Sequence, residues 1–370
     1  MSPRINFRRP TASAAGRVPG RWSNRACSLV VLMVVTVAVA ASCSTDASTR
    51  TAAAADEKAP TAKAVATLEP VPAGTTLRVG DQVEYLQTLL RLSGQDKDFP
   101  YTVEYSSFIG GPPMLQAFQG GALDTGFVGS TPLIFAQAAR QNIVAIAAWA
   151  SENGTQALVT TDPDIEGWDD LAGKRVAYQR GTAAEAGLLQ ALDREGIDPA
   201  EITADDVPIT QIAAALKGGS ADAGISVEPL ITKYLTETPG ARTAAQASEV
   251  TDRTNFLIAT REALDDRARS AALADYTARV VRGFTYLAAH PELLAESFYV
   301  KQYGLTPERA AQVQKAAGTT SVVLVPGDVV DQQQRLADLF AAAGQIPAKI
   351  DVDSEFDSRF NEIVRQARDS

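Results

Sequence analysis

Two segments of this 370-residue chain repeat the same pattern, and this repeat constrains the fold more than any other feature. Residues 115–128 read LQAFQGGALDTGFV and residues 213–226 read AAALKGGSADAGIS. Each has an apolar helix end, the motif Gly-Gly-x-x-Asp-x-Gly and a strand-like run. A Gly pair ends a helix by adopting positive φ, and Asp is a frequent turn residue. The repeat predicts two similar α/β lobes; a chance match between two short motifs is the alternative.

Short apolar strands alternate with helical stretches around both repeats. We expect strands over 77–80, 101–105, 125–128, 143–148, 175–178, 223–227 and 255–259, and helices over 84–92, 112–119, 132–140, 183–194 and 210–217. Such alternation is typical of parallel sheets that helices cover on both faces. Beyond the last strand the chain is expected to be almost wholly helical, over 261–290, 291–303, 307–317, 328–343 and 354–366.

Residues 1–42 have the pattern of a secretory signal peptide. Six Arg precede an apolar run that begins at Leu29, and this segment holds no Asp or Glu. The apolar core, about 13 residues long, is short for a membrane span. The sequence Ala-Ala-Ser-Cys at 40–43 is similar to a bacterial lipobox, which makes Cys43 the expected lipidation site. An incidental cysteine in an ordinary signal is one alternative, and twin-arginine export through Arg8-Arg9 is another.

Composition changes again after the signal. Residues 43–74 are rich in Ala, Thr, Ser and Pro and have too little apolar bulk to fold, so they are expected to form a flexible tether. The remaining body is long enough for two domains. Without residues 1–42 the chain keeps 28 basic and 44 acidic residues, a net charge of −16. This balance argues against binding to nucleic acid and against a broad electrostatic attraction to anionic lipid.

Candidate binding residues follow from the expected topology. Open α/β sheets bind ligands where strand ends meet helix N-termini, and two lobes place a cleft there. Ser130 or Thr131 is expected to cap one helix and Thr182 another, so that backbone N–H groups face a sulfonate, phosphate or carboxylate. Ordinary helix starts without a ligand are the alternative. The candidate ligand-binding residues are Asp81, Gln82, Gly110, Gly111, Ser130, Thr131, Gly181, Thr182, Glu185 and Glu228.

The stretch GGPPMLQAFQGGALDTGFVGSTPLIFAQAARQNIVAIAAW, residues 110–149, resembles the signature region of aliphatic sulfonate-binding proteins of ABC importers. LAGKRVAYQRGTAAE, ADAGISVEP and FLIATREAL resemble further segments of these proteins in the same order. The resemblance implies a type II periplasmic-binding fold, with two doubly wound α/β lobes around a cleft and a helical C-terminal tail. Lobe 1 would comprise 75–166 and 254–370, lobe 2 would be the insert 167–253, and the hinge crossings would lie near 162–167 and 251–255.

The same resemblance implies the biological role. The chain is expected to be an exported, monomeric lipoprotein on the extracytoplasmic face of the cell membrane. It would close its lobes over a small molecule and deliver it to a membrane permease and its ATPase. The family also includes relatives for taurine, nitrate and thiamine-pyrimidine precursors, so membership does not fix the ligand.

This chain departs from the family pattern at the site. Where sulfonate binders read Asp-Ala-Trp-x-x-Trp-Asp-Pro, residues 222–229 read DAGISVEP and lack both tryptophans, and Ser130 replaces a frequent Asp. Asp81, Glu185 and Glu228 place three carboxylates near one cleft, which disfavours a bare anion. We therefore expect a ligand that is larger than taurine or that carries a cationic or hydrogen-donating group. Carboxylates that face solvent or cap helices are the alternative.

An enzyme is the main competing class. The body holds one histidine, His290, and no cysteine beyond Cys43. It offers no Ser-His-Asp set, no His/Cys metal cluster and no P-loop. We expect no catalytic residue, no metal site and no cofactor. Paired carboxylates acting in acid–base chemistry, and a lipoprotein that senses its ligand for a partner, remain alternatives.

Overall fold

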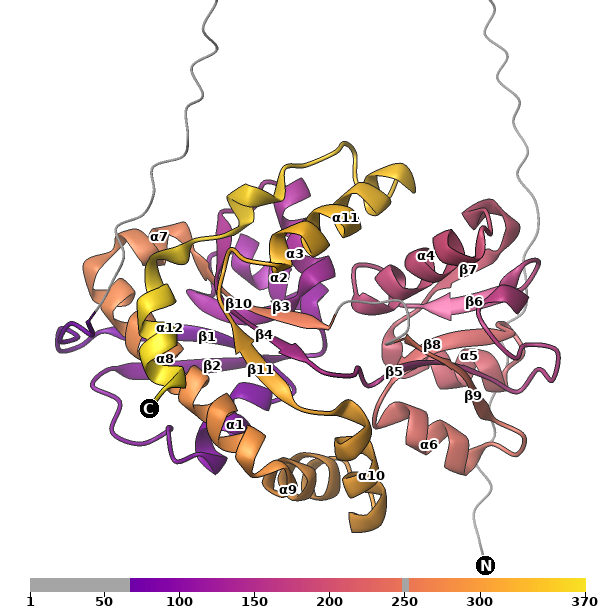
Figure 1. The fold of residues 1–370 in the computed structure, drawn as a ribbon, viewed down its shortest axis with the longest axis horizontal. Coiled ribbons are helices and arrows are strands. Elements are labelled where there is room, and N and C mark those ends of the chain that lie inside the picture. Colours follow the sequence, from indigo (N-terminus) through magenta and orange to yellow (C-terminus); the bar gives the residue numbers. More distant parts are fainter. Residues whose placement is uncertain (1–66, 248–252) are drawn as a thin grey trace, which may run out of the picture. The chain divides into compact units, whose positions relative to one another are not determined.

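Residues 67–247 and 253–370 are described in the computed structural model of the chain (Figure 1). Residues 58–370 form one compact unit. The expected signal peptide, Cys43 and most of the expected tether lie outside the described residues. Within the described part the strands form two sheets, of six and five strands.

The first sheet has the strand order β11-β4-β10-β3-β1-β2. Its strands are β1 Thr76–Gln82, β2 Thr102–Phe108, β3 Thr125–Gly129, β4 Ile143–Ser151, β10 Thr254–Thr260 and β11 Thr320–Val323. Strand β1 is parallel to β2 and β3, whereas β10 is antiparallel to β3 and β4, and β11 is antiparallel to β4. The expectation of purely parallel sheets is therefore wrong, because the returning strand β10 enters the sheet from the opposite direction. Strand β11 also interrupts the tail that was expected to be helical.

The second sheet has the order β7-β6-β8-β5-β9. Its strands are β5 Gln156–Thr160, β6 Arg175–Tyr178, β7 Thr203–Asp206, β8 Ala223–Val227 and β9 Arg242–Gln246. Strand β5 pairs antiparallel with β8 and β9, so the chain has already entered the second lobe at Gln156. We therefore place the first crossing between Ser151 and Gln156, upstream of the expected boundary at 166/167. The return crossing lies between Gln246 and Thr254 and includes residues outside the described part.

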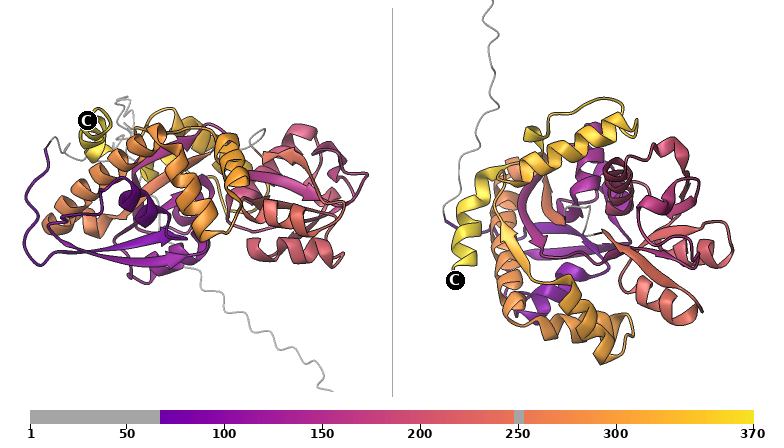
Figure 2. Two further views of the ribbon diagram at one scale, coloured as in Figure 1. Left: turned by 90° about the horizontal axis from the view of Figure 1, so that it is seen from below. Right: turned by 45° about the vertical axis from the view of Figure 1, so that its right-hand side comes forward.

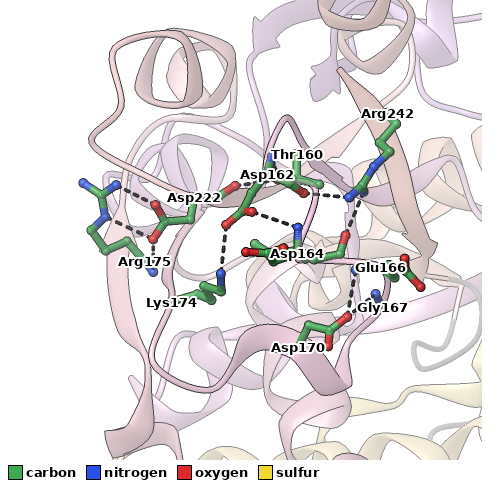
Figure 3. A network of polar contacts seen from close by, with 11 residues as sticks. Thr160, Asp162, Asp164, Glu166, Gly167, Asp170, Lys174, Arg175, Asp222 and Arg242 are labelled. Carbon is green, nitrogen blue, oxygen red and sulfur yellow. Dashed lines mark hydrogen bonds and ion pairs between the residues drawn. The ribbon is translucent and has the colours of Figure 1, made fainter. Parts of the chain in front are cut away.

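The first expected hinge, residues 162–167, is instead fixed inside lobe 2 (Figure 3). Arg242 donates Nη2 to the Asp162 carbonyl (2.6 Å) and Nη1 to the Ile165 carbonyl (2.7 Å). The Asp162 carboxylate pairs with Lys174 Nζ at 2.8 Å, and Asp170 accepts the N–H groups of 166 and 167. A segment with this many bonds to its own lobe does not absorb a rotation between lobes.

Helices cover both faces of each sheet. On the first sheet, α1 Tyr85–Leu92, α8 Arg267–Ala289 and α12 Asn361–Arg368 share one apolar core, while α2 Gly111–Gln119 and α3 Ser130–Ala138 share another. The second sheet packs against α4 Ala183–Glu195 through one core, and against α5 Ile212–Lys217 and α6 Leu230–Glu237 through another. Helix α7 Arg261–Asp265 follows β10. Both lobes are thus doubly wound, as expected.

The C-terminal part forms two excursions from lobe 1 (Figures 1 and 2). One comprises α9 Pro291–Leu294, a π-helix over Ala295–Gln302 and α10 Pro307–Ala317. The other is α11 Val329–Ala342, whose Leu336 and Phe340 pack with Ile134 of α3 and with Ala186 and Leu189 of α4. Its apolar face contacts both lobes.

The repeated motif forms the same structure in both lobes. In lobe 1 Arg78 donates Nη2 and Nε to the two oxygens of Asp124 (2.7 and 3.0 Å) and Nη1 to the Gly121 carbonyl (2.6 Å). In lobe 2 Arg175 makes the corresponding bonds to the two oxygens of Asp222 (2.6 and 3.1 Å; Figure 3). Its Nη1 donates to the Gly219 carbonyl at 2.6 Å. The second glycine of each pair has φ near +70°, as the motif predicts. The repeat is therefore structural, and the arginine at the start of β1 and β6 completes it.

Candidate functional site

A cavity of about 160 Å³ lies between the two lobes. Lobe 1 contributes the end of β3 and the start of α3, and lobe 2 contributes α4; among the lining residues are Gly129, Ser130, Thr131, Ala183, Ala186 and Gln190. Ser130 and Thr131 were predicted site residues and line the cavity. The other eight predicted residues do not line it. The crossing residues 153–156 and 253–255 form a further part of the wall.

A larger cavity, of about 940 Å³, lies elsewhere in lobe 1. It is bounded mainly by α1, α8, α9, the π-helix and α10, and no predicted site residue lines it. We place the candidate site at the smaller cavity because only that one joins both lobes, and a site built from both lobes is what closure requires.

Helix α3 begins at the wall of the interlobe cavity. Its N-cap residue is Gly129, which has no side chain to cap the helix, so the prediction that Ser130 or Thr131 caps it is wrong. Ser130 and Thr131 instead form the first turn and are buried. The first N–H groups of a helix have no partner within the helix and attract negative charge. A cavity wall formed by such an end suits an anionic group.

Helix α4 begins as predicted. Thr182 is the N-cap, its Oγ1 accepts from the Ala184 N–H at 3.2 Å, and its hydroxyl donates to the Gln179 carbonyl at 2.6 Å. Gly181 has φ +71° and donates its N–H to Glu185 Oε2 at 2.7 Å. The Glu185 side chain is buried, which raises the pKa of its carboxyl despite that hydrogen bond. Glu185 Oε1 has no hydrogen-bond partner among the described residues.

Asp81 binds the helix that follows its own strand. Its Oδ1 accepts from the Leu86 N–H (2.9 Å), and its Oδ2 accepts from the Gln87 N–H (3.0 Å). The side chain is fully buried, and burial raises the pKa of the carboxyl while these hydrogen bonds oppose the rise. The neighbouring Gln82 donates Nε2 to the Phe127 carbonyl at 2.8 Å. Both side chains hold the end of β1 in place.

Glu228 makes the same kind of contact in lobe 2. Its Oε2 accepts from the N–H (3.1 Å) and hydroxyl (2.7 Å) of Thr232 at the start of α6, and Arg309 Nη2 lies 3.5 Å from its Oε1. Asp81, Glu185 and Glu228 therefore each have an internal partner. Because each carboxylate is bound within its own lobe, the structure gives no support to the expectation that all three contact one ligand. The alternative, that these carboxylates bind the starts of helices, describes them.

Gly110 and Gly111 serve the packing of two helices that begin at this edge. Gly110 precedes α2 with φ +88°. A Cβ on Gly111 would lie 2.5 Å from Pro132 Cγ in the first turn of α3, which is closer than atoms approach. Glycine at 111 thus lets α2 lie directly against the start of α3.

Two buried residues behind α3 were missed by the sequence reasoning. Gln333 of α11 donates Nε2 to the Ser130 carbonyl (3.0 Å) and to Glu355 Oε2 (2.9 Å). Both side chains are buried, and burial raises the pKa of Glu355 to about 8. The contact joins residues 203 positions apart, and neither residue belongs to a motif, so no sequence signal could have found it.

The described residues contain no group of three or more His, Cys, Asp or Glu that could hold a metal ion. No helix among them is long and apolar enough to cross a bilayer.

Comparisons with known proteins agree with this geometry. Residues 111–293 match the family model described as NMT1/THI5 like. The chain is 26% identical over 287 residues to a putative aliphatic sulfonates-binding protein of Escherichia coli K12, which covers 75% of this chain and 86% of that protein.

Solved structures show the same fold. The alkanesulfonate-binding protein of Xanthomonas axonopodis pv. citri, solved with MOPS bound, superposes with a TM-score of 0.68 at 24% identity over 77% of this chain and 99% of that one. The desulfurization enzyme DSZB shares the fold at 13% identity, with a TM-score of 0.56 over 79% of this chain and 99% of that one. The described chain therefore has the type II periplasmic-binding fold, and its residues 111–293 are similar to the NMT1/THI5-like family.

Proposed function

We propose that this chain is an extracytoplasmic solute-binding lipoprotein that closes its two lobes over a sulfonate-like small molecule and delivers it to an ABC importer. The observation that carries the proposal is the cavity between the lobes, whose wall holds the start of α3 on one side and the first turn of α4 on the other. Two helix N-termini at one small cavity favour an anionic group, and the cationic side chain of Arg253 belongs to the same wall.

The comparisons support this class of ligand. The E. coli relative is named for aliphatic sulfonates, and the Xanthomonas structure holds MOPS, a bulky sulfonate with an amine-bearing ring. None of residues 222–229, where both family tryptophans are lost, lines the cavity. We include related organosulfur and nitrogen compounds in the ligand class, because the ring of MOPS carries nitrogen. The ligand-binding set proposed from sequence narrows to Ser130 and Thr131 at the cavity, with Gly181 and Thr182 shaping the start of α4.

Calorimetric titration tests the ligand class. The panel contains ethanesulfonate, taurine, MOPS and the carboxylate analogue of each. We expect the sulfonates to bind, MOPS among them because the Xanthomonas structure holds it. A protein that binds none of them while native mass spectrometry finds another co-purified molecule would lie outside the proposed ligand class.

Attachment to the membrane has a separate test. Cys43 follows the lipobox-like sequence, so we propose that the mature chain begins there and carries lipid. In the native host the parent should fractionate with membranes and Cys43→Ser should not. Cys27→Ser, which lies inside the signal, is the control. Equal fractionation of all three chains would contradict lipidation at Cys43.

Catalysis is the second candidate function, because the desulfurization enzyme shares the fold. We propose binding without conversion. His290 lies at the N-cap position of α9 and pairs with Glu292 at 3.6 Å on the surface, so the one histidine of the chain is not at the cavity. Bound MOPS recovered unchanged by mass after prolonged incubation is the expected result. A product of lower mass would favour the enzyme.

A further inference from the structure

The π-helix at 295–302 holds the loop that follows β1 in lobe 1. Gln302 donates Nε2 to the Val83 carbonyl at 2.7 Å, and Val83 packs with the aromatic cluster of this helix. Phe298 of that cluster contacts Tyr85 of α1, with ring centroids 5.5 Å apart. Val83 has φ +49°, a conformation that costs a β-branched residue energy and needs support from its surroundings. One end of the excursion is thus anchored to lobe 1 beside the end of β1.

The other end of the same excursion contacts lobe 2. Arg309 of α10 donates Nε to Thr232 Oγ1 at 2.9 Å, and its Nη2 lies 3.5 Å from Glu228 Oε1. The Thr232 hydroxyl in turn donates to Glu228 Oε2 at 2.7 Å. Arg309, Thr232 and Glu228 therefore form a short chain of hydrogen bonds, in which each bond polarises the next.

Tyr299 of the same excursion is affected by the charge of Glu228. It belongs to the π-helix and is buried, and its pKa is raised to about 12, first by burial and second by the negative charge of Glu228. Glu228, which lies between β8 and α6, thus interacts electrostatically with two side chains of the excursion, Tyr299 and Arg309.

We infer that Arg309 is a positioning residue for solute binding. It ties lobe 2 to the excursion of lobe 1 that comprises α9, the π-helix and α10. It thereby sets the fraction of molecules in which the two lobes are already in contact, the joined form, before a solute arrives. The inference rests on the proposed function, because solute affinity rises with the fraction of protein already in the binding-competent arrangement. Arg309 itself does not line the cavity.

The primary test uses the solute-free, full-length chain. Cys27 and Cys43 are replaced by Ser, and spin labels are placed at Asp96→Cys in lobe 1 and Asp193→Cys in lobe 2, which are both exposed. Interlobe distances are then measured by pulsed electron paramagnetic resonance for the parent, Arg309→Met and Thr232→Val. Methionine keeps the apolar stem of arginine and valine keeps the shape of threonine, so the variants remove polar groups with little change in packing; Thr232→Val also removes the hydroxyl bond to Glu228, and Arg309→Met also removes the contact with Gln312.

We expect the equilibrium constant for the joined form to fall about three- to ten-fold in Arg309→Met, as for a partly exposed charged hydrogen bond. This equilibrium constant should fall similarly in Thr232→Val. The double variant should lower it little further, because both changes remove the hydrogen bond between Arg309 and Thr232. Arg335→Met on α11 is the matched control, since Arg335 is exposed and has no partner among the described residues. Distance distributions of Arg309→Met that coincide with those of the parent would overturn the inference.

A second measurement separates this inference from the proposed function. MOPS affinity is determined by calorimetry for the same variants. If the proposed function holds, Arg309→Met weakens MOPS binding by the same factor by which it lowers the fraction of molecules in the joined form. If the parent binds no sulfonate while the distances still respond to Arg309→Met, the proposed ligand fails and the inference stands. If the parent binds MOPS and neither distances nor affinity respond, the inference alone fails.

Discussion

At the scale of single residues, the two repeated aspartates show how the same bonds differ in energy when their surroundings differ. Asp124 is 1% exposed, and its Oδ1 pairs with Arg269 Nη1 at 3.2 Å in addition to Arg78. Asp222 is 25% exposed, and Arg175 is 44% exposed. Burial pushes the pKa of Asp124 upward, but the hydrogen bonds and charges of its arginines together outweigh burial and lower it. The pKa of Asp222 is lowered chiefly by its hydrogen bond to Arg175.

These surroundings predict unequal losses. Asp124→Ala leaves Arg78 and Arg269, which are partly buried, without their shared partner, so we expect a loss of about 3 kcal/mol in the free energy of unfolding. Asp222→Ala should lower the free energy of unfolding by clearly less, because water can replace the carboxylate as the partner of the exposed Arg175. Urea denaturation measures both, with Asp331→Ala at an exposed position of α11 as the control. Equal losses would show that burial does not govern the strength of the motif.

Glu355 predicts a pH dependence of stability. Its pKa is about 8 in the fold, above the ordinary value of 4.5, because burial disfavours the charge. The folded state therefore keeps a proton that the unfolded chain releases, so this residue lowers stability as pH rises from about 4.5 to about 8. Glu355→Gln mimics the protonated acid and removes this loss. We expect the variant to be roughly 4 kcal/mol more stable than the parent at pH 8 and to differ from it by less than about 1 kcal/mol at pH 5. Melting temperatures at both pH values measure it; a variant less stable than the parent at pH 8 would refute the burial argument.

At the scale of elements, the glycines at helix ends separate two kinds of constraint. Gly121 and Gly219 have φ of +69° and +70°, and a Cβ there would meet no atom within 4 Å. Alanine at either position should cost about 1 kcal/mol from backbone strain alone. Gly111→Ala should cost more and should shift α2 away from α3, because its Cβ would clash with Pro132. Unfolding free energies and a crystal structure of the Gly111 variant check this; equal costs at all three positions would contradict it.

Elements with a local signal could be predicted from the sequence, and those formed by distant pairing could not. The strands at 125–129 and 223–227 follow a Gly pair and an Asp, and both were found. Strand β9 reads RTAAQ and β11 reads TSVV, and neither has enough apolar alternation to indicate a strand. No strand was expected at β5, and the expected boundary at 166/167 put its residues in lobe 1, since its pairing with β8 and β9 joins residues far apart in the chain.

The same limit applies to the site. Thr182 was recognisable because a cap is a local feature, and Ser130 and Thr131 because they follow a strand and precede Pro132. Asp81, Glu185 and Glu228 looked like ligand groups, since sequence shows a carboxylate but not its backbone partners. Arg309 is separated from Glu228 by 81 residues, so its role required the fold.

At the scale of the whole molecule, contacts between the lobes occur on two sides of the interlobe cavity. Helix α11 packs its apolar residues against α3 and α4, and Arg309 reaches the corner after β8. Near the start of α2, a Cβ on Gly181 of lobe 2 would lie 3.4 Å from Pro112 Cγ of lobe 1. Binding by closure requires these contacts to open and reform.

A cross-link between the lobes tests that requirement. We replace Cys27 and Cys43 by Ser and introduce Pro112→Cys with Gly181→Cys, since a cysteine sulfur takes the place of the proline Cγ and the two sites are within reach of a disulfide. Oxidised protein formed without solute should take up MOPS at least ten-fold more slowly than the reduced protein, and reductant should restore the rate. The two single variants control for strain at Gly181, whose φ is +71°. If the oxidised and reduced proteins exchange MOPS equally fast, entry does not depend on separation of the lobes and capture by closure is wrong; if the disulfide does not form, the contact between Pro112 and Gly181 is not made in solution.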